Sequence, residues 1–385
     1  MTLKGIFGRK LISEKGEIYT KLRELVSPKI SLELPEHEVT NKLLINMFPQ
    51  DEAFLVINGF KKTIRPTSAR KIRKRTQLSK TLVKSLLNKM VYAGKLIKYG
   101  PFYIMLPYIP GGFEFYFTTG RDDPERMKKV AEAHDELFNL GYPLGLSKMK
   151  PPIYRVISTI QPTNDTIEIN KSVDVEHQVL PYEVLKEYLA EKKDFAVVAC
   201  SCRTAAEMAG HPCERTAENF CITAGILARY SIKTGVGREV TLEELMDVMQ
   251  RAEKEGLVHQ TINIKKNSGF ICNCCPCCCG FLKSVKKLDN YGAIIKSNFD
   301  PSIDQQKCVS CSICQEICPM DAILKTNGAQ QDSKEQKIKI NKDLCIGCGL
   351  CASHCPHGAI SLDKVRGYEP IKGLLKYLRK VEKEN

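Results

Sequence analysis

Three things are missing from this sequence, and each absence excludes a class of protein. No cysteine precedes Cys200, although the chain has 18 cysteines, whereas a secreted disulfide scaffold is short and spreads its cysteines along the chain. No apolar run approaches the roughly 18 residues that cross a bilayer, so we expect no membrane span. The first residues lack the apolar stretch of a secretory signal, so we expect a cytoplasmic protein.

Signatures of several common chemistries are also missing. The sequence has no G-x-x-x-x-G-K-[ST] phosphate loop and no G-x-S-x-G nucleophile turn. The run from Gly347 to Ala352 fits the loose G-x-G-x-x-A pattern of a dinucleotide-binding turn, but the cysteine repeat described below explains it better. We therefore assign no catalytic residue.

Acidic residues are absent from one segment, which makes it a basic module. The chain has 385 residues, enough for two to four domains of roughly 100–200 residues each, and a formal net charge of +14. Residues 61–100 contain no Asp or Glu and account for nearly all of that charge. Their cations are Lys61, Lys62, Arg65, Arg70, Lys71, Arg73, Lys74, Arg75, Lys80, Lys84, Lys89, Lys95 and Lys98.

The basic segment has the pattern of two helices followed by a hairpin. A short helix is expected over 38–48, a second over 67–75, and a third after Ser79, a favourable N-cap. Residues 96–99 and 102–106 read as a two-stranded hairpin around Gly100-Pro101. In the order of its elements, the segment resembles the winged helix-turn-helix family.

That resemblance implies contact with nucleic acid. Lys80 and Lys84 would lie on the recognition helix, and the preceding helix would add Arg70, Arg73, Lys74 and Arg75. The alternative, which we favour, is that the module packs against the rest of the chain or docks an acidic redox partner protein.

Further elements follow from capping and periodicity. A helix begins after Asp123 with Pro124 in its first turn, and its buried face would hold Met127, Val130, Ala131 and Leu137. Thr241 and Glu244 form a capping box for a helix over 241–255. We also expect loops and short strands over 142–180, a helix over 181–192, a buried strand over 195–199 that leads into Cys200, and an exposed loop over 327–337.

The most specific motif is a repeated cysteine run with the spacing C-x2-C-x2-C-x3-C-P. Three cysteines spaced in this way can surround one corner of a cubane, and the fourth points away and reaches the other cluster. We therefore assign one cluster, called cluster A, to Cys308, Cys311, Cys314 and Cys355. The other, called cluster B, is assigned to Cys345, Cys348, Cys351 and Cys318.

Residues 300–365 resemble the bacterial-type ferredoxins that carry two [4Fe–4S] clusters. The resemblance implies low-potential transfer of single electrons. The sequence departs from the minimal family pattern in the longer, polar stretch between its two copies. A pair of zinc sites is the alternative, but zinc sites use four thiolates in two pairs and do not need this run twice.

Ten more cysteines lie in the middle of the chain. They are Cys200, Cys202, Cys213, Cys221, Cys272, Cys274, Cys275, Cys277, Cys278 and Cys279. Their density exceeds what one cubane needs, so one or two further metal centres are expected, with Arg203 placed to offset thiolate charge. We expect the strand over 195–199 to deliver Cys200 and Cys202 to the pocket of the later run.

The nature of this middle centre stays open at the level of sequence. An iron–sulfur centre is favoured over structural zinc, and redox-active thiols are the third alternative. The pattern is loosely similar to multi-domain iron–sulfur proteins of anaerobic electron transfer. His211, His259 and His354 are disfavoured as extra ligands, because a lone histidine is more often a hydrogen-bonded structural residue.

The C-terminal segment is expected to form an amphipathic helix after Pro370. Core docking is favoured over membrane-surface binding, because the apolar face lacks Trp and Phe. That face is formed by Ile371, Leu374, Leu375, Leu378 and Val381.

Together these patterns predict an α+β, multi-domain fold. The expected domains are a basic winged-helix-like module (1–110), a connecting segment (111–180), a Cys-rich metal-binding domain (181–290), a ferredoxin domain (296–366) and the C-terminal helix (367–385). The first hypothesis is an iron–sulfur electron-transfer protein or subunit. The alternatives are a redox-responsive DNA-binding regulator and an oxidoreductase whose substrate site lies at Cys272–Cys279.

Overall fold

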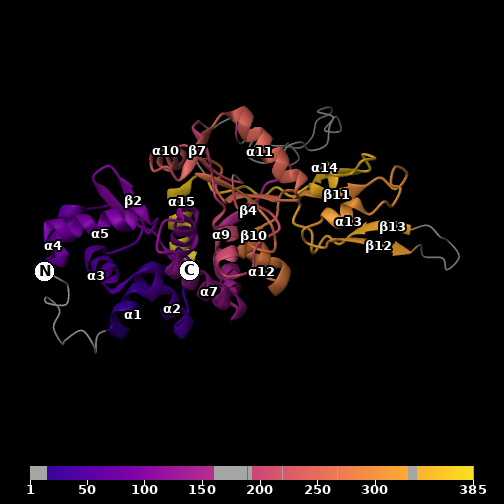
Figure 1. Ribbon diagram of the computed structural model, residues 1–385. Coiled ribbons are helices and arrows are strands. Elements are labelled where there is room, and N and C mark those ends of the chain that lie inside the picture. The colour runs from indigo at the N-terminus through magenta and orange to yellow at the C-terminus, as the bar shows by residue number, and fades with distance from the viewer. Residues whose placement is uncertain are drawn as a thin grey trace. The chain divides into compact units, whose positions relative to one another are not determined.

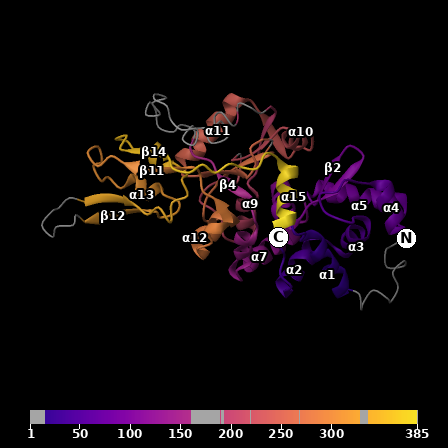
Figure 2. The same ribbon diagram turned by 180° about the vertical axis from the view of Figure 1, so that it is seen from behind.

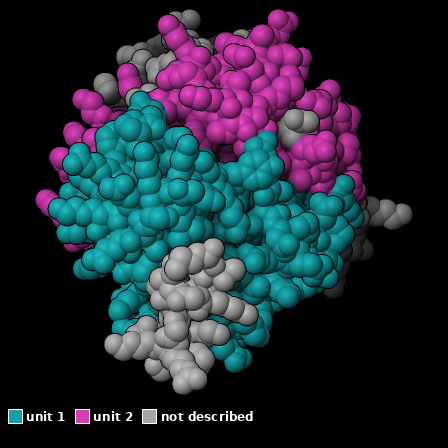
Figure 3. Space-filling model, turned by 60° about the vertical axis from the view of Figure 1, so that its left-hand side comes forward, with its two compact units in different colours: residues 1–145, 201–214, 385 teal, residues 146–200, 215–384 magenta. Residues whose placement is uncertain are grey.

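The structure is a computed structural model that describes residues 15–159, 189, 193–218, 220–266, 268–327 and 336–384. It combines helices and strands and divides into two compact units (Figures 1 and 3). Unit 1 contains residues 1–145, 201–214 and 385, and unit 2 contains residues 146–200 and 215–384. Apart from Leu189, the helix expected over 181–192 lies outside the described residues.

Unit 1 is mainly helical. Its helices are α1 (Lys15–Val26), α2 (Glu38–Met47), α3 (Gln50–Gly59), α4 (Ala69–Thr76), α5 (Lys80–Tyr92), α6 (Phe113–Thr119), α7 (Pro124–Asn139) and α9 (Ser201–Met208), with a short turn η2 (Tyr108–Gly112). Its small sheet has the order β1-β3-β2, formed by β1 (Thr67–Ser68), β2 (Leu96–Tyr99) and β3 (Phe102–Met105). Helices α2 and α7 pack against each other through the apolar faces that periodicity predicts.

Two predicted helix starts in unit 1 are confirmed, and one is wrong. The helix expected from residue 67 starts at Ala69, because Thr67 and Ser68 form β1 and the Ser68 side chain caps α4. The Ser79 side chain accepts a hydrogen bond from the backbone N–H of Leu82, which caps α5. The Asp123 carboxylate accepts from the N–H of Arg126 and caps α7. Each cap satisfies a backbone donor that the first turn of a helix leaves without a partner.

One cation of the basic segment is buried. The Lys95 ammonium lies 2.8 Å from Glu52 Oε2 and 2.7 Å from Asp122 Oδ2, and its side chain is 0% exposed. Lys89 adds a second ammonium 2.8 Å from Glu52 Oε1. Lys95 therefore belongs to the core of unit 1, whereas the other cations of the segment are exposed.

Unit 2 is built on a seven-stranded sheet with the order β10-β4-β8-β9-β6-β5-β7. Its strands are β4 (Tyr154–Val156), β5 (Phe195–Val198), β6 (Cys221–Ala224), β7 (Gly237–Val240), β8 (Val258–Ile262), β9 (Phe270–Cys274) and β10 (Ile294–Ile295). All neighbours pair antiparallel except β10 and β4. The strand expected before Cys200 is present as β5, and all its residues are buried.

Three helices accompany this sheet. They are α10 (Ile226–Lys233), α11 (Leu242–Lys254) and α12 (Gly280–Leu288), with a short turn η5 (Tyr291–Ala293). The capping box before α11 is confirmed, because Thr241 accepts from the N–H of Glu244 and Glu244 accepts from the N–H of Thr241. A further turn, η3 (Tyr142–Lys148), precedes β4.

The remainder of unit 2 contains two short strand pairs and two short helices, gathered at one end of that unit (Figures 1 and 2). β11 (Phe299–Ile303) pairs with β14 (Ile360–Lys364), and β12 (Ile323–Asn327) pairs with β13 (Gln336–Ile340). The helices are α13 (Ile313–Ile317) and α14 (Leu350–Ser353). Of the loop expected over 327–337, Asn327 belongs to β12 and residues 336–337 belong to β13, and residues 328–335 lie outside the described residues.

The C-terminal helix α15 (Leu374–Glu384) corrects one prediction. Tyr377 and Val381 are its buried residues, whereas Leu374 and Leu375 are 46% and 72% exposed. The predicted face is therefore right at Val381 and wrong at Leu374 and Leu375, because Tyr377 supplies the other buried contact and its hydroxyl donates to the carbonyl of Pro151 over 3.1 Å. Among the described helices, none is long and apolar enough to cross a membrane.

Candidate metal centres

The two copies of the cysteine repeat fold alike. In each copy, a residue in the left-handed region precedes a short helix that carries the third cysteine. Ser312 (φ +71°) plays this part before α13, and Gly349 (φ +84°) plays it before α14. The sharp turn lets three thiols of one copy face the same side.

Eight thiols line two separate hollows in this part of unit 2. One hollow is lined by Cys308, Cys311, Cys314 and Cys355. The second is lined by Cys345, Cys348, Cys351 and Cys318. Each hollow takes three cysteines from one copy and the fourth from the other copy, which are the same two sets that the sequence assigns to clusters A and B.

Backbone amides are aimed at these sulfur atoms. The N–H of Ala322 donates to Cys318 Sγ over 3.3 Å, and the N–H of Ala359 donates to Cys355 Sγ over 3.3 Å. The N–H of Gly347 donates to Cys345 Sγ over 3.4 Å. Such donors favour the thiolate, the form of cysteine that binds metal.

Burial of these cysteines opposes formation of the thiolate. It raises the pKa of the Cys351 thiol to about 12 and that of Cys348 well above its usual value. A thiolate in this apolar surrounding needs a compensating positive charge, which bound iron supplies. Gly347 (φ +70°) shows how closely the second loop is held, because a Cβ there would strike Phe299 O and Ser297 Oγ.

A comparison with protein families identifies this region. Residues 307–359 match the family model described as a 4Fe-4S dicluster domain. They form a ferredoxin-type iron–sulfur domain. Searches of curated proteins and of solved structures found no similar protein. The match covers all eight cysteines of the two hollows and their amide donors, so the residues present fit at least one [4Fe–4S] cluster.

Five further thiols gather on the large sheet of unit 2, and we call them the sheet thiols. They are Cys200, Cys221, Cys272, Cys274 and Cys279. Strand register explains the grouping: Ile222 pairs with Ile271, so the next positions outward, Cys221 and Cys272, lie opposite each other. Cys272 and Cys274 share one face of β9 because side chains alternate along a strand.

The sheet thiols contact one another in a chain. A hydrogen bond with Cys200 raises the pKa of Cys221, and one with Cys221 raises the pKa of Cys272. Hydrogen bonds with Cys272 and Cys279 raise the pKa of Cys274. Gln260, which lies on β8, donates from Nε2 to Cys279 Sγ over 3.7 Å.

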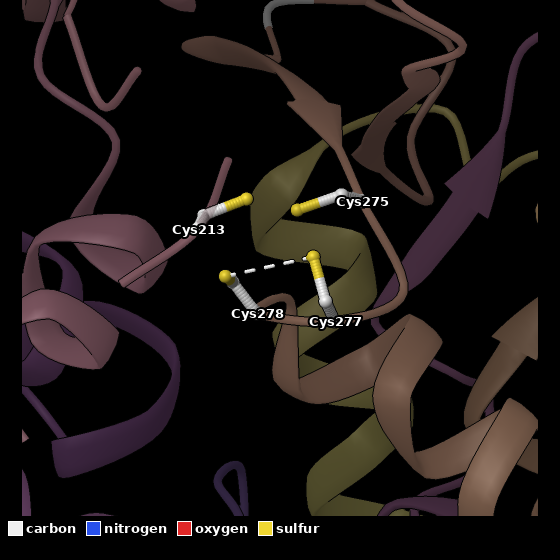
Figure 4. Close-up of side chains that lie close together, drawn as sticks. All are labelled: Cys213, Cys275, Cys277 and Cys278. Carbon is white, nitrogen blue, oxygen red and sulfur yellow. Dashed lines mark hydrogen bonds between the residues drawn. The ribbon is translucent and has the colours of Figure 1, made fainter. Parts of the chain in front are cut away.

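Three other cysteines occupy the turn between β9 and α12, and we call them the turn thiols. The Sγ atoms of Cys275, Cys277 and Cys278 lie within 4.8 Å of one another (Figure 4). Cys275 is buried, Cys278 is half-buried and Cys277 is exposed. This is a spacing at which several thiols can share one metal site.

The structure thus divides a run that the sequence left as one group. Alternation along β9 sends Cys272 and Cys274 to the sheet thiols, and the turn after them separates the others. A period of two in Ile271-Cys272-Asn273-Cys274 is the signal that sequence reasoning missed. Asn273, on the opposite face, donates to Phe220 O over 2.7 Å.

The remaining candidates are two cysteines of the segment 201–214 and the histidines. Cys202 and Cys213 lie in the segment 201–214 and are half-buried. Figure 4 also draws Cys213. Their role as metal ligands stays a prediction. His259 uses both ring nitrogens in hydrogen bonds, to Asn273 Oδ1 at 2.6 Å and Glu253 Oε1 at 3.1 Å. Both ring nitrogens are therefore engaged within unit 2.

Proposed function

We propose that this chain is an iron–sulfur electron-transfer protein whose ferredoxin-type domain holds two [4Fe–4S] clusters. Cluster A is bound by Cys308, Cys311, Cys314 and Cys355, and cluster B by Cys345, Cys348, Cys351 and Cys318. The observation that carries this proposal is the pair of hollows, each lined by four cysteines in a three-plus-one division. When bound, each cluster accepts and releases one electron at a time.

The residues around the hollows supply what such clusters need. The thiolates fix the iron atoms, and the amides of Ala322, Gly347 and Ala359 lower the cost of their negative charge. A small apolar core that includes Phe299, Ile323, Ile338 and Ile360 keeps water from the inner side. Cys311 is exposed, which leaves cluster A accessible to a partner protein.

We further propose that the middle cysteines bind one or two additional metal centres, with iron–sulfur favoured over zinc. The sheet thiols Cys200, Cys221, Cys272 and Cys274 supply the four ligands of one centre, and Cys279 lies beside them. The turn thiols supply three ligands of another. Cys202 and Cys213 stay predicted metal ligands. Metal binding stabilises the folded state most where the ligands are distant in sequence, because the metal closes a long loop that stays open in the unfolded chain.

An anaerobic metal count of the full chain tests these assignments. We expect about eight irons and eight sulfides from clusters A and B, and about twelve to sixteen irons in total if one or two more cubanes form. The double change Cys221→Ala and Cys272→Ala should lower only the excess, and Cys277→Ala with Cys278→Ala should lower a separate part of it.

The joint change Cys274→Ala and Cys275→Ala touches both groups and should remove the whole excess. Zinc in place of the excess iron would show a structural site instead. Eight irons, no zinc and freely titrating thiols at these positions would refute a middle metal centre.

A second candidate function rests on the exposed cations of unit 1. Helices α4 and α5 with the β1-β3-β2 sheet have the order of a winged helix-turn-helix, and Lys80 and Lys84 are exposed on α5. We favour docking of an acidic redox partner by this surface, and DNA binding by a redox-responsive regulator is the alternative.

Neutralising the basic surface separates these alternatives. The joint change of Arg73, Lys74, Lys80 and Lys84 to Ala should leave the iron content unchanged. It should lower the association rate with an acidic electron-transfer protein and flatten its salt dependence. Arg75 is kept, because its guanidinium donates to Gly59 O over 2.6 Å and supports the fold.

The matched control removes four exposed lysines elsewhere in unit 1: Lys29, Lys42, Lys128 and Lys129. A gel shift that only the first variant abolishes would favour the regulator. Equal behaviour of both variants in both assays would leave the basic surface without a specific partner.

A further inference from the structure

The two copies of the ferredoxin repeat differ in what covers them. Cys311 is exposed in the first copy, whereas its counterpart Cys348 is half-buried in the second. The cover comes from residues 157–159, which follow β4 and lie outside the matched region 307–359. Ser158 Oγ donates to Gly347 O over 3.0 Å, and the N–H of Thr159 donates to Cys348 O over 3.1 Å.

The Thr159 side chain has a hydroxyl that needs explanation. The residue is 1% exposed, and its Oγ1 has no hydrogen-bond partner in the part of the chain that the structure describes. A buried hydroxyl without a partner destabilises the folded protein, because it loses its hydrogen bonds to water. Such an atom therefore indicates an acceptor that belongs to the working protein.

The hydroxyl lies against the loop that lines the second hollow. Thr159 Oγ1 is 2.8 Å from the position that a Cβ on Gly349 would occupy, and Gly349 is one of the residues lining that hollow. Only glycine leaves room for this approach, because Leu362 Cδ1 is equally close on the same side. A cluster bound in that hollow would offer sulfur atoms as acceptors beside Gly349.

We propose that the Thr159 hydroxyl donates a hydrogen bond to a sulfur of cluster B and so raises the reduction potential of that cluster. This inference rests on the proposed presence of cluster B. A hydrogen bond to sulfur favours the reduced state, which carries one more negative charge. Thr159 thereby offsets the opposite effect of burial, which makes the reduced cluster harder to form.

The consequence is a bias of the electron toward cluster B. With both clusters bound, an electron that a one-electron donor protein delivers to the exposed cluster A would pass to cluster B more favourably than it would without the Thr159 hydroxyl, and cluster A would return to its oxidised state. Cluster B is the inner cluster, because its cover leads to the large sheet. The N–H of Ile157 donates to His259 O over 3.0 Å, and His259 bonds to Asn273, the residue between Cys272 and Cys274.

The test is a potentiometric titration of the full chain, reduced with dithionite and followed by electron paramagnetic resonance. Thr159→Val keeps the shape of the side chain and removes the donor. We expect the equilibrium constant for reduction of cluster B to fall about tenfold. This is a fall in its reduction potential of about 59 mV for a one-electron couple. Thr159→Ser should retain the wild-type potential, and iron content should stay the same in both variants.

Two controls make the result specific. Thr326→Val makes the same change on exposed strand β12, where the hydroxyl donates to Lys337 O, and should leave both potentials unchanged. Chains with Cys311→Ala or Cys348→Ala identify which signal belongs to which cluster.

Unchanged potentials in Thr159→Val, with higher stability from the loss of an unpaired hydroxyl, would show that Thr159 is only structural. A shift confined to cluster A, or a Thr159→Ser chain that behaves like Thr159→Val, would also overturn the proposal. A wild-type chain that binds no iron at Cys345, Cys348 and Cys351 would refute the proposed function itself, and this inference with it.

Discussion

In a chain that carries Cys318→Ala, we expect the loss of the cluster that the second copy of the repeat holds. Cys318 belongs to the first copy, yet it lines the hollow with Cys345, Cys348 and Cys351. Removing it leaves three thiolates on a cluster built for four, and iron should fall by about four atoms per chain. Iron and sulfide analysis of the full chain measures this directly.

Pairs of changes provide the control, because two losses in one cluster do not add. Cys318→Ala with Cys348→Ala should lose about four irons, as either change alone does, since both remove ligands of cluster B. Cys318→Ala with Cys311→Ala should lose about eight, since each removes a ligand of a different cluster. The reverse pattern would mean that each copy of the repeat holds its own cluster.

Lys95→Met should destabilise unit 1 by about 3–5 kcal/mol. The change removes the ammonium between Glu52 and Asp122, whose side chains are 0% and 6% exposed, and leaves two carboxylates in the core. Methionine has a similar volume, so the loss reports on charge more than on packing. Urea denaturation with pulse proteolysis, with cleavage mapped to residues 15–145, gives the free energy of unfolding of this unit.

The matched control is Lys62→Met, an exposed lysine of the same basic segment, which should change stability by less than about 0.5 kcal/mol. Adding Glu52→Gln and Asp122→Asn to Lys95→Met should recover part of the loss, because the two buried carboxylate charges that Lys95 balanced are then gone. If Lys95→Met and Lys62→Met have equal effects, the buried ion pairs do not stabilise unit 1.

Local signals predicted local structure well. Ser79, Asp123 and the Thr241–Glu244 box each bond the backbone groups that their positions in the sequence imply. The repeated cysteine spacing likewise implied two sets of four thiols, and the two hollows contain those sets. In these cases the determining interaction lies within a few residues or within a repeat that fixes its own geometry.

The pairing of strands and side chains that are distant in the chain could not be predicted from the sequence. Nothing in the cysteine run indicates that β9 lies between β6 and β8, and that order is what brings Cys221 opposite Cys272. The burial of Lys95 could not be predicted either, because a lysine is buried only where carboxylates from other parts of the chain pair with it. Thr159 gave no signal, since its surroundings come from a loop far along the chain.

The central claim is that two neighbouring [4Fe–4S] clusters in the ferredoxin-type domain carry single electrons. The most direct test is electron paramagnetic resonance of the dithionite-reduced full chain, with integration of the spins. Compared with the Cys318→Ala chain, the wild-type chain should show one additional spin and the broadening that arises when two paramagnetic clusters interact. A wild-type spectrum of a single isolated cluster, unchanged by Cys318→Ala, would contradict the account.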